Sequence, residues 1–258
     1  MVAASTVHYW IDNYEWWKQM IHYYGMPDRV LMTLEVRNDG WTDENIQDYC
    51  NFMKYLMDEF MNDYCHGDAK LFGNAVVAAR QKDEDPHLSG YIPWCIGPVD
   101  TYHGCTISQE LVVRVGDLAI CPCHRTAYEE YLYGKFVVEN NKIVDIKAIN
   151  PEMAVKVIMS NLLTSDPVCS QCEIKEICLH GCLGSQLETM KDPFFPIPNI
   201  CKFFKTKYKF ILKYYKDHGI IDYLKTYSMG EPCGYRAALI LQLYDRLEEE
   251  INNELGVS

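Results

Sequence analysis

The chain has 258 residues, with 24 Lys and Arg against 36 Asp and Glu, so its formal net charge is −12. A hydrophobic content of 48% excludes a disordered chain, and the length allows one large domain or two modest ones. An acidic chain without a basic run argues against a nucleic-acid partner, since phosphates must be neutralised by Lys and Arg. No apolar run reaches the ~18 residues of a membrane span and no signal-peptide pattern is present, so we expect a cytoplasmic protein with no membrane partner.

The N-terminal part predicts a helix, a strand and a second helix. Apolar residues at helical spacing predict a helix over residues 10–24, which Pro27 cannot continue. Residues 29–37 are almost continuously apolar, as buried strands of parallel sheets are. Residues 42–64 carry an apolar stripe at helical spacing behind Thr42, a favourable N-cap. This order is a fragment of α/β architecture.

The middle of the chain predicts hairpins, and helices follow it. One hairpin is expected from strands 111–115 and 118–120, and the other from strands 135–138 and 142–146. Asn140 and Asn141 tolerate the positive φ that the second turn requires. Helices are predicted over residues 150–163, 202–217 and 235–255. The predicted fold class is therefore α/β (α+β).

Twelve cysteines are the most unusual feature of the sequence. Disulfides are rare in a reducing compartment, where clustered cysteines indicate a metal or catalysis. Four cysteines form the run Cys169-x2-Cys172-x5-Cys178-x3-Cys182, and Cys201 follows it. Such short spacings let several thiolates converge on one inorganic centre. The remaining positions outside the cysteine-rich region are expected to be ordinary thiols: Cys50, Cys65 and Cys233.

A longer pattern includes this run. Cys105, ten residues, Gly116, four residues and Cys121 precede it. The whole order resembles the SPASM domain, the C-terminal module of radical S-adenosylmethionine enzymes that binds auxiliary iron–sulfur clusters. The family pattern is a Cys, nine to fifteen residues, a Gly, four residues and a Cys, then the same four-Cys run and a final Cys. Every spacing is met, over roughly residues 95–205.

The resemblance implies two auxiliary [4Fe–4S] clusters. One, called here the Cys169 cluster, would be held by Cys169, Cys172, Cys178 and Cys201. The other, the Cys182 cluster, would be held by Cys182, Cys105 and either Cys121 or Cys123, since both thiols of Cys121-Pro122-Cys123 are candidates. Cys95 is the only nearby cysteine that would complete the Cys182 cluster. Without it, one iron stays open and could bind substrate.

His124, directly after Cys123, has two interpretations. In some SPASM enzymes the residue after the ligand accepts a proton from the substrate radical. A His has an unperturbed pKa of about 6.5, which suits that task near neutrality. The alternative is a hydrogen-bond donor to the sulfur of a cluster.

The stretches Cys178-Leu-His-Gly-Cys182-Leu-Gly-Ser-Gln186 and Pro122-Cys123-His124-Arg125, with a following Tyr128, look most like those of maturases of ribosomally made peptides. The resemblance implies a radical S-adenosylmethionine peptide-modifying enzyme that forms a thioether or carbon–carbon crosslink, or performs a related oxidation. Its substrate would be a precursor peptide, and ferredoxin or flavodoxin would exchange electrons with it. The auxiliary clusters would take up an electron, bind the substrate, or both.

The Cys-x3-Cys-x2-Cys loop that starts radical chemistry does not occur in the sequence. That loop would bind a third [4Fe–4S] cluster and S-adenosylmethionine, for which no residue of this chain can be assigned. We therefore expect a C-terminal portion, inactive alone, whose radical SAM barrel lies in the same chain or a separate one. Residues 1–68 would be the end of a partial (β/α)6 barrel. Residues 69–225 would be the SPASM domain of short hairpins, cluster-binding loops and helices, and 226–258 a C-terminal helix.

Three other hypotheses fit the cysteines. They could hold structural zinc in four-thiolate sites and make an interaction module. The chain could also be a free-standing iron–sulfur electron carrier, or a non-catalytic adaptor that presents a peptide to a partner enzyme. The substrate and the bond formed cannot be read from the sequence.

Overall fold

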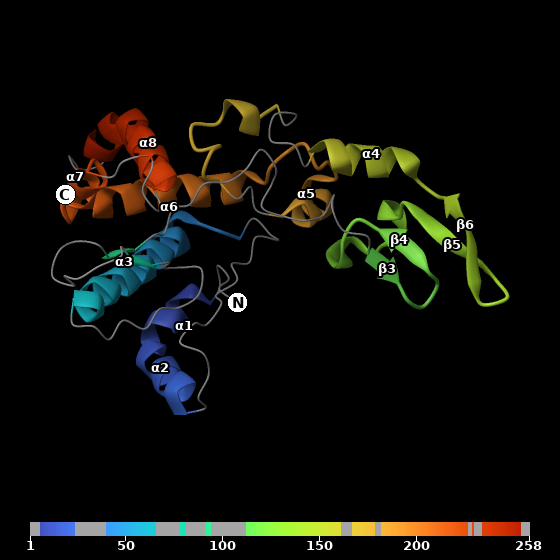
Figure 1. Cartoon of the computed structure of the whole chain (residues 1–258), viewed down its shortest axis with the longest axis horizontal. Coiled ribbons are helices and arrows are strands. Elements are labelled where there is room, and N and C mark those ends of the chain that lie inside the picture. Colours follow the sequence, from blue (N-terminus) through green and yellow to red (C-terminus); the bar gives the residue numbers. More distant parts are fainter. Residues whose placement is uncertain are drawn as a thin grey trace. The chain divides into compact units, whose positions relative to one another are not determined.

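The protein combines helices with a small sheet (Figure 1). The computed structural model describes residues 6–23, 40–65, 78–80, 91–93, 112–160, 167–178, 182–226, 229 and 234–253. Within these ranges the structure is mostly helical, with one four-stranded antiparallel open sheet and a two-stranded ribbon. The expectation of a mixed α and β chain is confirmed, and the described strands form no barrel. None of the described helices combines the length and apolar character that a membrane span requires.

The chain divides into two compact units. The first, the helical unit, comprises Met1–Glu35, Gly40–Pro98 and Lys202–Ser258. The second, the sheet unit, comprises Val36–Asp39 and Val99–Cys201. The domain limits expected from the sequence, near residues 68 and 225, stay a prediction.

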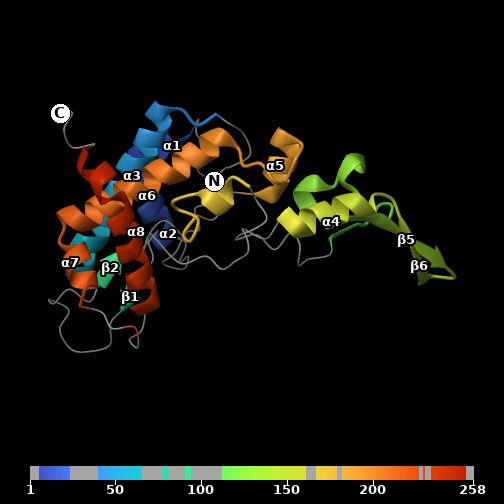
Figure 2. The ribbon, with the colours of Figure 1, turned by 90° about the horizontal axis from the view of Figure 1, so that it is seen from above.

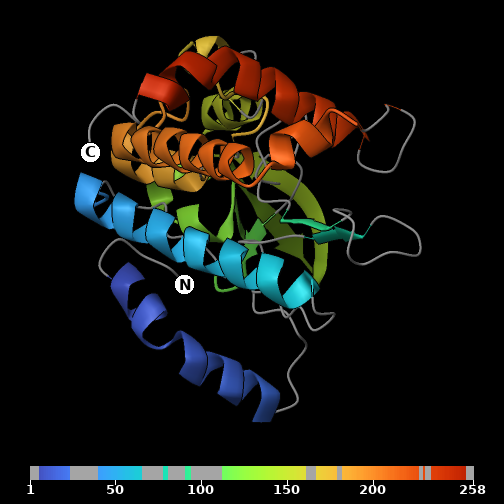
Figure 3. The ribbon, with the colours of Figure 1, turned by 90° about the vertical axis from the view of Figure 1, so that its left-hand side faces the viewer.

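The helical unit is built around two long helices that lie side by side, α3 and α6 (Figure 3). The ring of Phe203 on α6 lies 4.5 Å from that of Trp41 and 4.9 Å from that of Tyr49, between centroids. Further along, the Tyr214 hydroxyl donates a hydrogen bond of 2.9 Å to Asp58. The elements of this unit are α1 (Val7–Asp12), α2 (Tyr14–Tyr23), α3 (Asp43–Cys65), β1 (Ala78–Arg80), β2 (Tyr91–Pro93), α6 (Pro198–Asp217, whose first turn belongs to the sheet unit), α7 (Ile220–Leu224) and α8 (Gly234–Asn253).

Most of the predicted helices of this unit are confirmed, with shifted ends. The first is two helices rather than one, because the chain turns at Asn13, whose side-chain amide donates to the Tyr9 carbonyl at 2.9 Å. The helix predicted over 202–217 begins earlier, at Pro198, a residue favoured in the first helical turn. The predicted strand over residues 29–37 and the end of the last helix, 254–255, lie outside the described residues.

The sheet unit contains a meander of four strands in the order β3-β4-β5-β6. Both predicted hairpins are confirmed. Asn140 and Asn141 have φ values of 50° and 59°, which is the conformation of a two-residue hairpin turn. The elements are β3 (Val112–Arg114), β4 (Ala119–Cys121), η2 (His124–Thr126), η3 (Glu129–Tyr131), β5 (Gly134–Glu139), β6 (Lys142–Ala148), α4 (Pro151–Ser160), η5 (Cys169–Gln171) and α5 (Leu183–Met190).

The β5–β6 hairpin reaches past the rest of the sheet (Figure 2). β4 pairs only with the first two residues of β5, Gly134 and Lys135. The Phe136 N–H still donates to the Leu118 carbonyl at 3.1 Å, and from Val137 to the turn β5 pairs, among the described residues, with β6 alone. Every residue of β6 is exposed. α4 confirms the helix predicted after this hairpin, and residues 161–163 of that prediction lie outside the described residues.

The turn between β3 and β4 is held by Arg114. Its guanidinium donates to both carboxylate oxygens of Asp117, at 2.8 and 2.6 Å, to Glu129 at 2.5 Å and to the Ala127 carbonyl at 3.0 Å. The residue with positive φ in this turn is Leu118, at 60°. The Arg114 side chain therefore ties the hairpin to the segment that follows β4.

We expect Arg114→Gln to lower the melting temperature at neutral pH, because it removes this ion-paired clamp. Hydrogen bonding from Arg114 lowers the pKa of Asp117 to about 2. A carboxylate whose folded pKa is depressed stabilises the fold above its unfolded value of about 4, and this contribution is lost as the pH falls toward 2. Melts followed by circular dichroism should therefore show a lower melting temperature for the variant at pH 7. The difference from the wild type should shrink as the pH falls from about 4 toward 2. Lys142→Gln, on exposed β6, serves as the control, and a difference that persists unchanged to pH 2 would contradict the prediction.

Candidate cysteine site

Two candidate ligands lie at the end of β4. Cys121 and Cys123 are both buried, at 0% and 9% exposure, but they point into different parts of the core. The Cys121 thiol packs with Ala119 and Leu132 and donates to the Val112 carbonyl at 3.5 Å. Cys123 instead belongs to the hydrophobic cluster formed by Tyr131, Val157, Leu183 and Leu187.

The short η2 turn fixes Cys123. The Thr126 backbone N–H donates to the Cys123 carbonyl at 3.1 Å, and the Cys123 N–H donates to the Thr126 hydroxyl at 3.2 Å. The Cys123 sulfur lies 3.5 Å from the same hydroxyl, and Thr126 is fully buried. Because both partners are buried and hydrogen-bonded, the position of this thiol is set by the backbone.

The sulfurs of Cys182 and Cys123 both lie close to Gly184. A Cβ on residue 184 would lie 3.3 Å from the Cys123 sulfur and 3.5 Å from the Cys182 sulfur, with the Thr126 methyl at 3.4 Å. Both sulfurs therefore lie close to the bare Cα of Gly184, and a side chain at this position would contact them. Cys182 directly precedes α5, a helix that the sequence did not predict individually.

The guanidinium of Arg125 lies beside the Cys182 sulfur. The Nη1 of Arg125 lies 3.5 Å from this sulfur and 3.4 Å from the Ser185 hydroxyl. Burial raises the pKa of Cys182, but hydrogen bonds from Ser185 and Arg125 outweigh it, so that the pKa is lowered overall. The pKa of Cys121 is raised, mainly by burial. Of these two thiols, Cys182 is the one that the fold favours as a thiolate.

Buried polar groups without partners occur in the same unit. Gln186 is 2% exposed, and neither atom of its amide has a hydrogen-bond partner among the described residues. The same holds for the Tyr133 hydroxyl, which is buried. Burial, followed by the thiols of Cys123 and Cys121, raises the pKa of Tyr133. Buried polar groups without partners call for an explanation, such as a further group or a water molecule that would complete them.

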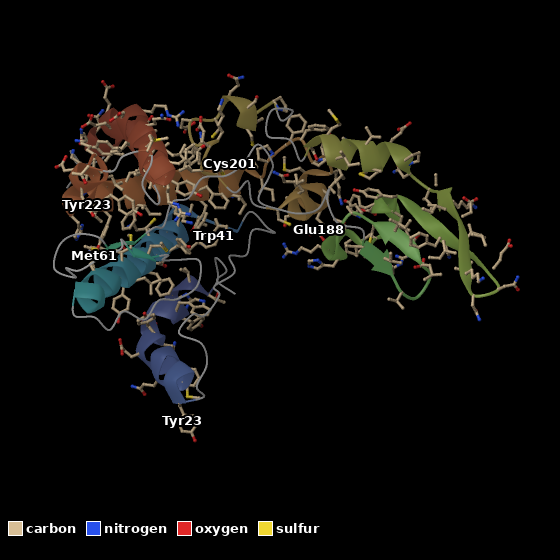
Figure 4. The ribbon with its side chains drawn as sticks, viewed as in Figure 1. Tyr23, Trp41, Met61, Glu188, Cys201 and Tyr223 are labelled. Atoms are coloured by element: carbon tan, nitrogen blue, oxygen red, sulfur yellow. The ribbon has the colours of Figure 1, made fainter. Side chains whose placement is uncertain are left out.

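The remaining cysteines lie in consecutive turns. The Cys172 N–H donates to the Cys169 carbonyl at 3.1 Å, and the Cys178 N–H donates to the Ile174 carbonyl at 2.9 Å. Cys169 is buried, whereas Cys172 and Cys178 are half-buried. Figure 4 shows Cys201 on the first turn of α6 and Glu188 on α5.

The structure thus brings together only part of the predicted ligand set. Among the described side chains, no group of three or more His, Cys, Asp or Glu is placed to hold a metal ion, and no disulfide is formed. Cys95 and Cys105 lie outside the described residues, and His124 is exposed. The sulfurs of Cys123 and Cys182 both lie beside Gly184, whereas Cys121 belongs to a different part of the core. Two neighbouring cysteine sulfurs are the type of donor that an iron–sulfur group takes.

Several residues of this site were not found from the sequence. Arg125, Gly184, Ser185 and Gln186 belong to the stretches that resemble peptide maturases, but the sequence predicted no role for them, and Tyr133 was one of many aromatic residues. The available signal was position: Arg125 follows Pro-Cys-His, and Gly184 comes two residues after a candidate ligand.

Comparison with known proteins adds nothing to this site. No protein-family model matches the chain, and neither the curated proteins nor the solved structures contain a match. The resemblance to the SPASM domain therefore depends on the cysteine pattern.

Thiol reactivity in the metal-free protein should follow these environments. We expect Cys182 to be alkylated by iodoacetamide at neutral pH well before Cys121, because the thiolate is the nucleophile. Cys50, which is 1% exposed and whose pKa burial raises to about 12, should react only on unfolding. Peptide mapping by mass spectrometry at successive times measures the order, and alkylation of Cys50 before Cys182 would contradict it.

Proposed function

We propose that this chain carries the auxiliary [4Fe–4S] clusters of a radical S-adenosylmethionine enzyme of the SPASM type, which modifies a ribosomally made peptide. The observation that carries the proposal is the spacing of the cysteines from Cys105 to Cys201. The proximity of the Cys123 and Cys182 sulfurs, which both lie beside Gly184, supports it, because the two thiols come from distant parts of the sequence.

The structure favours one of the two alternatives for the Cys182 cluster. The sulfurs of Cys123 and Cys182 both lie within 3.5 Å of the Cβ position of Gly184, whereas Cys121 packs with Ala119 and Leu132. We therefore assign Cys105, Cys123 and Cys182 to this cluster, with Cys95 as the candidate fourth ligand. The Cys169 cluster would be held by Cys169, Cys172, Cys178 and Cys201. When bound, such clusters would supply electron uptake, and an iron without a cysteine ligand would bind substrate.

The residues around Cys123 would prepare this site. Tyr131, Val157, Leu183 and Leu187 are at most 4% exposed and exclude water from one side of the thiol. Thr126 holds Cys123 in place through its hydroxyl. The exposed His124 would be available to accept a proton from a substrate that approaches from solvent.

The proposal includes partners that the chain does not contain. S-adenosylmethionine and a third [4Fe–4S] cluster would belong to a radical SAM barrel, in the same or a separate chain. The substrate would be a precursor peptide, and ferredoxin or flavodoxin would exchange electrons in the reducing cytoplasm, where thiolates persist.

Iron and sulfide analysis of anaerobically purified and reconstituted protein tests the proposal. We expect about eight irons and eight sulfides per chain, with electron paramagnetic resonance signals of reduced [4Fe–4S] clusters after dithionite. Cys123→Ala should lose about half of the iron, whereas the matched variant Cys121→Ala should retain it. Cys50→Ala, in the helical unit, controls for a general effect of removing a thiol. Colourless protein that contains zinc and no iron would overturn the proposal in favour of a zinc module.

A further inference from the structure

Arg125 lies where it can act on a cluster ligand without being one. Its Nη1 is 3.5 Å from the Cys182 sulfur and 3.4 Å from the Ser185 hydroxyl, and its side chain is half-buried. Guanidinium is always protonated in proteins and has donors but no acceptor. A charge-assisted hydrogen bond to a thiolate is therefore the interaction that this geometry provides.

The fold holds the guanidinium near this sulfur. Arg125 is the middle residue of η2, whose ends are joined by the hydrogen bonds between Cys123 and Thr126. α5 packs against η2, and the bare Cα of Gly184 permits their close approach. Cys182 and Ser185 both come from the start of α5, so that Arg125 joins the two segments.

We propose that Arg125 is a positioning residue that raises the reduction potential of the Cys182 cluster through its hydrogen bond to the Cys182 sulfur. This inference rests on the proposed function. Reduction adds one negative charge to the cluster, and a fixed positive charge beside a ligand sulfur stabilises the reduced form more than the oxidised form. Hydrogen bonds to cluster sulfurs are among the factors that set these potentials. No proton moves in this step, because the guanidinium stays protonated.

A redox titration of the reconstituted full chain with dithionite, followed by electron paramagnetic resonance, tests the proposal. Arg125→Gln should change the ratio of reduced to oxidised Cys182 cluster about tenfold at a given potential, which is a midpoint lower by 59 mV for one electron. The signal that disappears in Cys123→Ala identifies this cluster. The midpoint of the Cys169 cluster should not move and is the internal control. Arg125→Lys keeps the charge but not the planar fork, so it should lower the midpoint by less than Arg125→Gln does.

The controls separate a specific role from a general one. Lys142→Gln removes the same charge from the exposed β6 and should leave both midpoints unchanged. If Arg125→Gln does not retain the Cys182 cluster, Arg125→Met, which keeps the apolar stem, provides the measurement and should show the same lowering. A midpoint that equals that of the wild type in a variant with full iron content overturns the role of Arg125. Wild-type protein without iron and sulfide overturns the proposed function itself.

Discussion

Gly184→Val should abolish incorporation of the Cys182 cluster, so that reconstituted protein contains about half of the wild-type iron. A Cβ at this position already lies 3.3 Å from the Cys123 sulfur and 3.5 Å from the Cys182 sulfur. The two further methyl groups of valine would crowd both sulfurs, to which the iron of the cluster would have to bind. Overpacking of a well-packed site also costs about 1–3 kcal/mol of stability. Iron, sulfide and electron paramagnetic resonance measurements would show the loss of one cluster and retention of the other.

A control distinguishes this effect from destabilisation by any glycine replacement. Gly116 belongs to the same cysteine pattern, but a Cβ there would meet nothing within 4 Å. We expect Gly116→Val to retain the full iron content. Gly184→Val protein with full iron content and unchanged spectra would contradict the assignment of Cys123 and Cys182 to one site.

Gly134→Ala should destabilise the sheet unit by about 1–3 kcal/mol, the usual range for forcing atoms into a packed position. A Cβ on residue 134 would lie 2.8 Å from the backbone carbonyl oxygen of Lys147, a contact that real Cβ atoms essentially never show. Backbone cannot rotate away as a side chain does, so β6 must shift. The shift would affect the pairs of Gly134 with Ala148 on β6 and with Ile120 on β4.

Chemical denaturation followed by circular dichroism would measure this difference. Gly116→Ala is the matched control, because its exposed position is open, and we expect a change within about 0.5 kcal/mol, as at most surface positions. A Gly134→Ala variant as stable as this control would show that β5 and β6 do not approach as closely as the structure has them.

The parts of the fold that local chemistry determines could be predicted from the sequence. The Asn140-Asn141 turn was predictable because few residues other than Asn accept positive φ at two successive positions. The helix α3 was predictable because its apolar residues recur at helical spacing and so form one apolar face. Leu118 shows the limit, because its positive φ is imposed by the pairing of β3 with β4 and by the clamp at Arg114 rather than by its own preference.

The sequence predicted which cysteines are candidate ligands, but not which of them lie near one another. The spacing pointed to Cys123 and Cys182 as candidate ligands, and it left Cys121 as an equal alternative. Which of the two thiols lies near Cys182 depends on how α5 packs against η2, a contact between segments far apart in the sequence. α5 itself was not predicted, because Gly184 and Ser185 are weak helix formers.

Because the outer part of the β5–β6 hairpin extends beyond the rest of the sheet, this part of the chain can tolerate insertions and deletions. The outer part of this hairpin shares no backbone pairing with β4, so its length and tip can vary while the register that positions Cys121 and Cys123 is kept. A few residues gained or lost around Asn140 would cost little closure entropy. The hairpin is therefore the part of the sheet unit most free to diverge, and a natural point of attachment for a probe that must report on the cysteines without disturbing them.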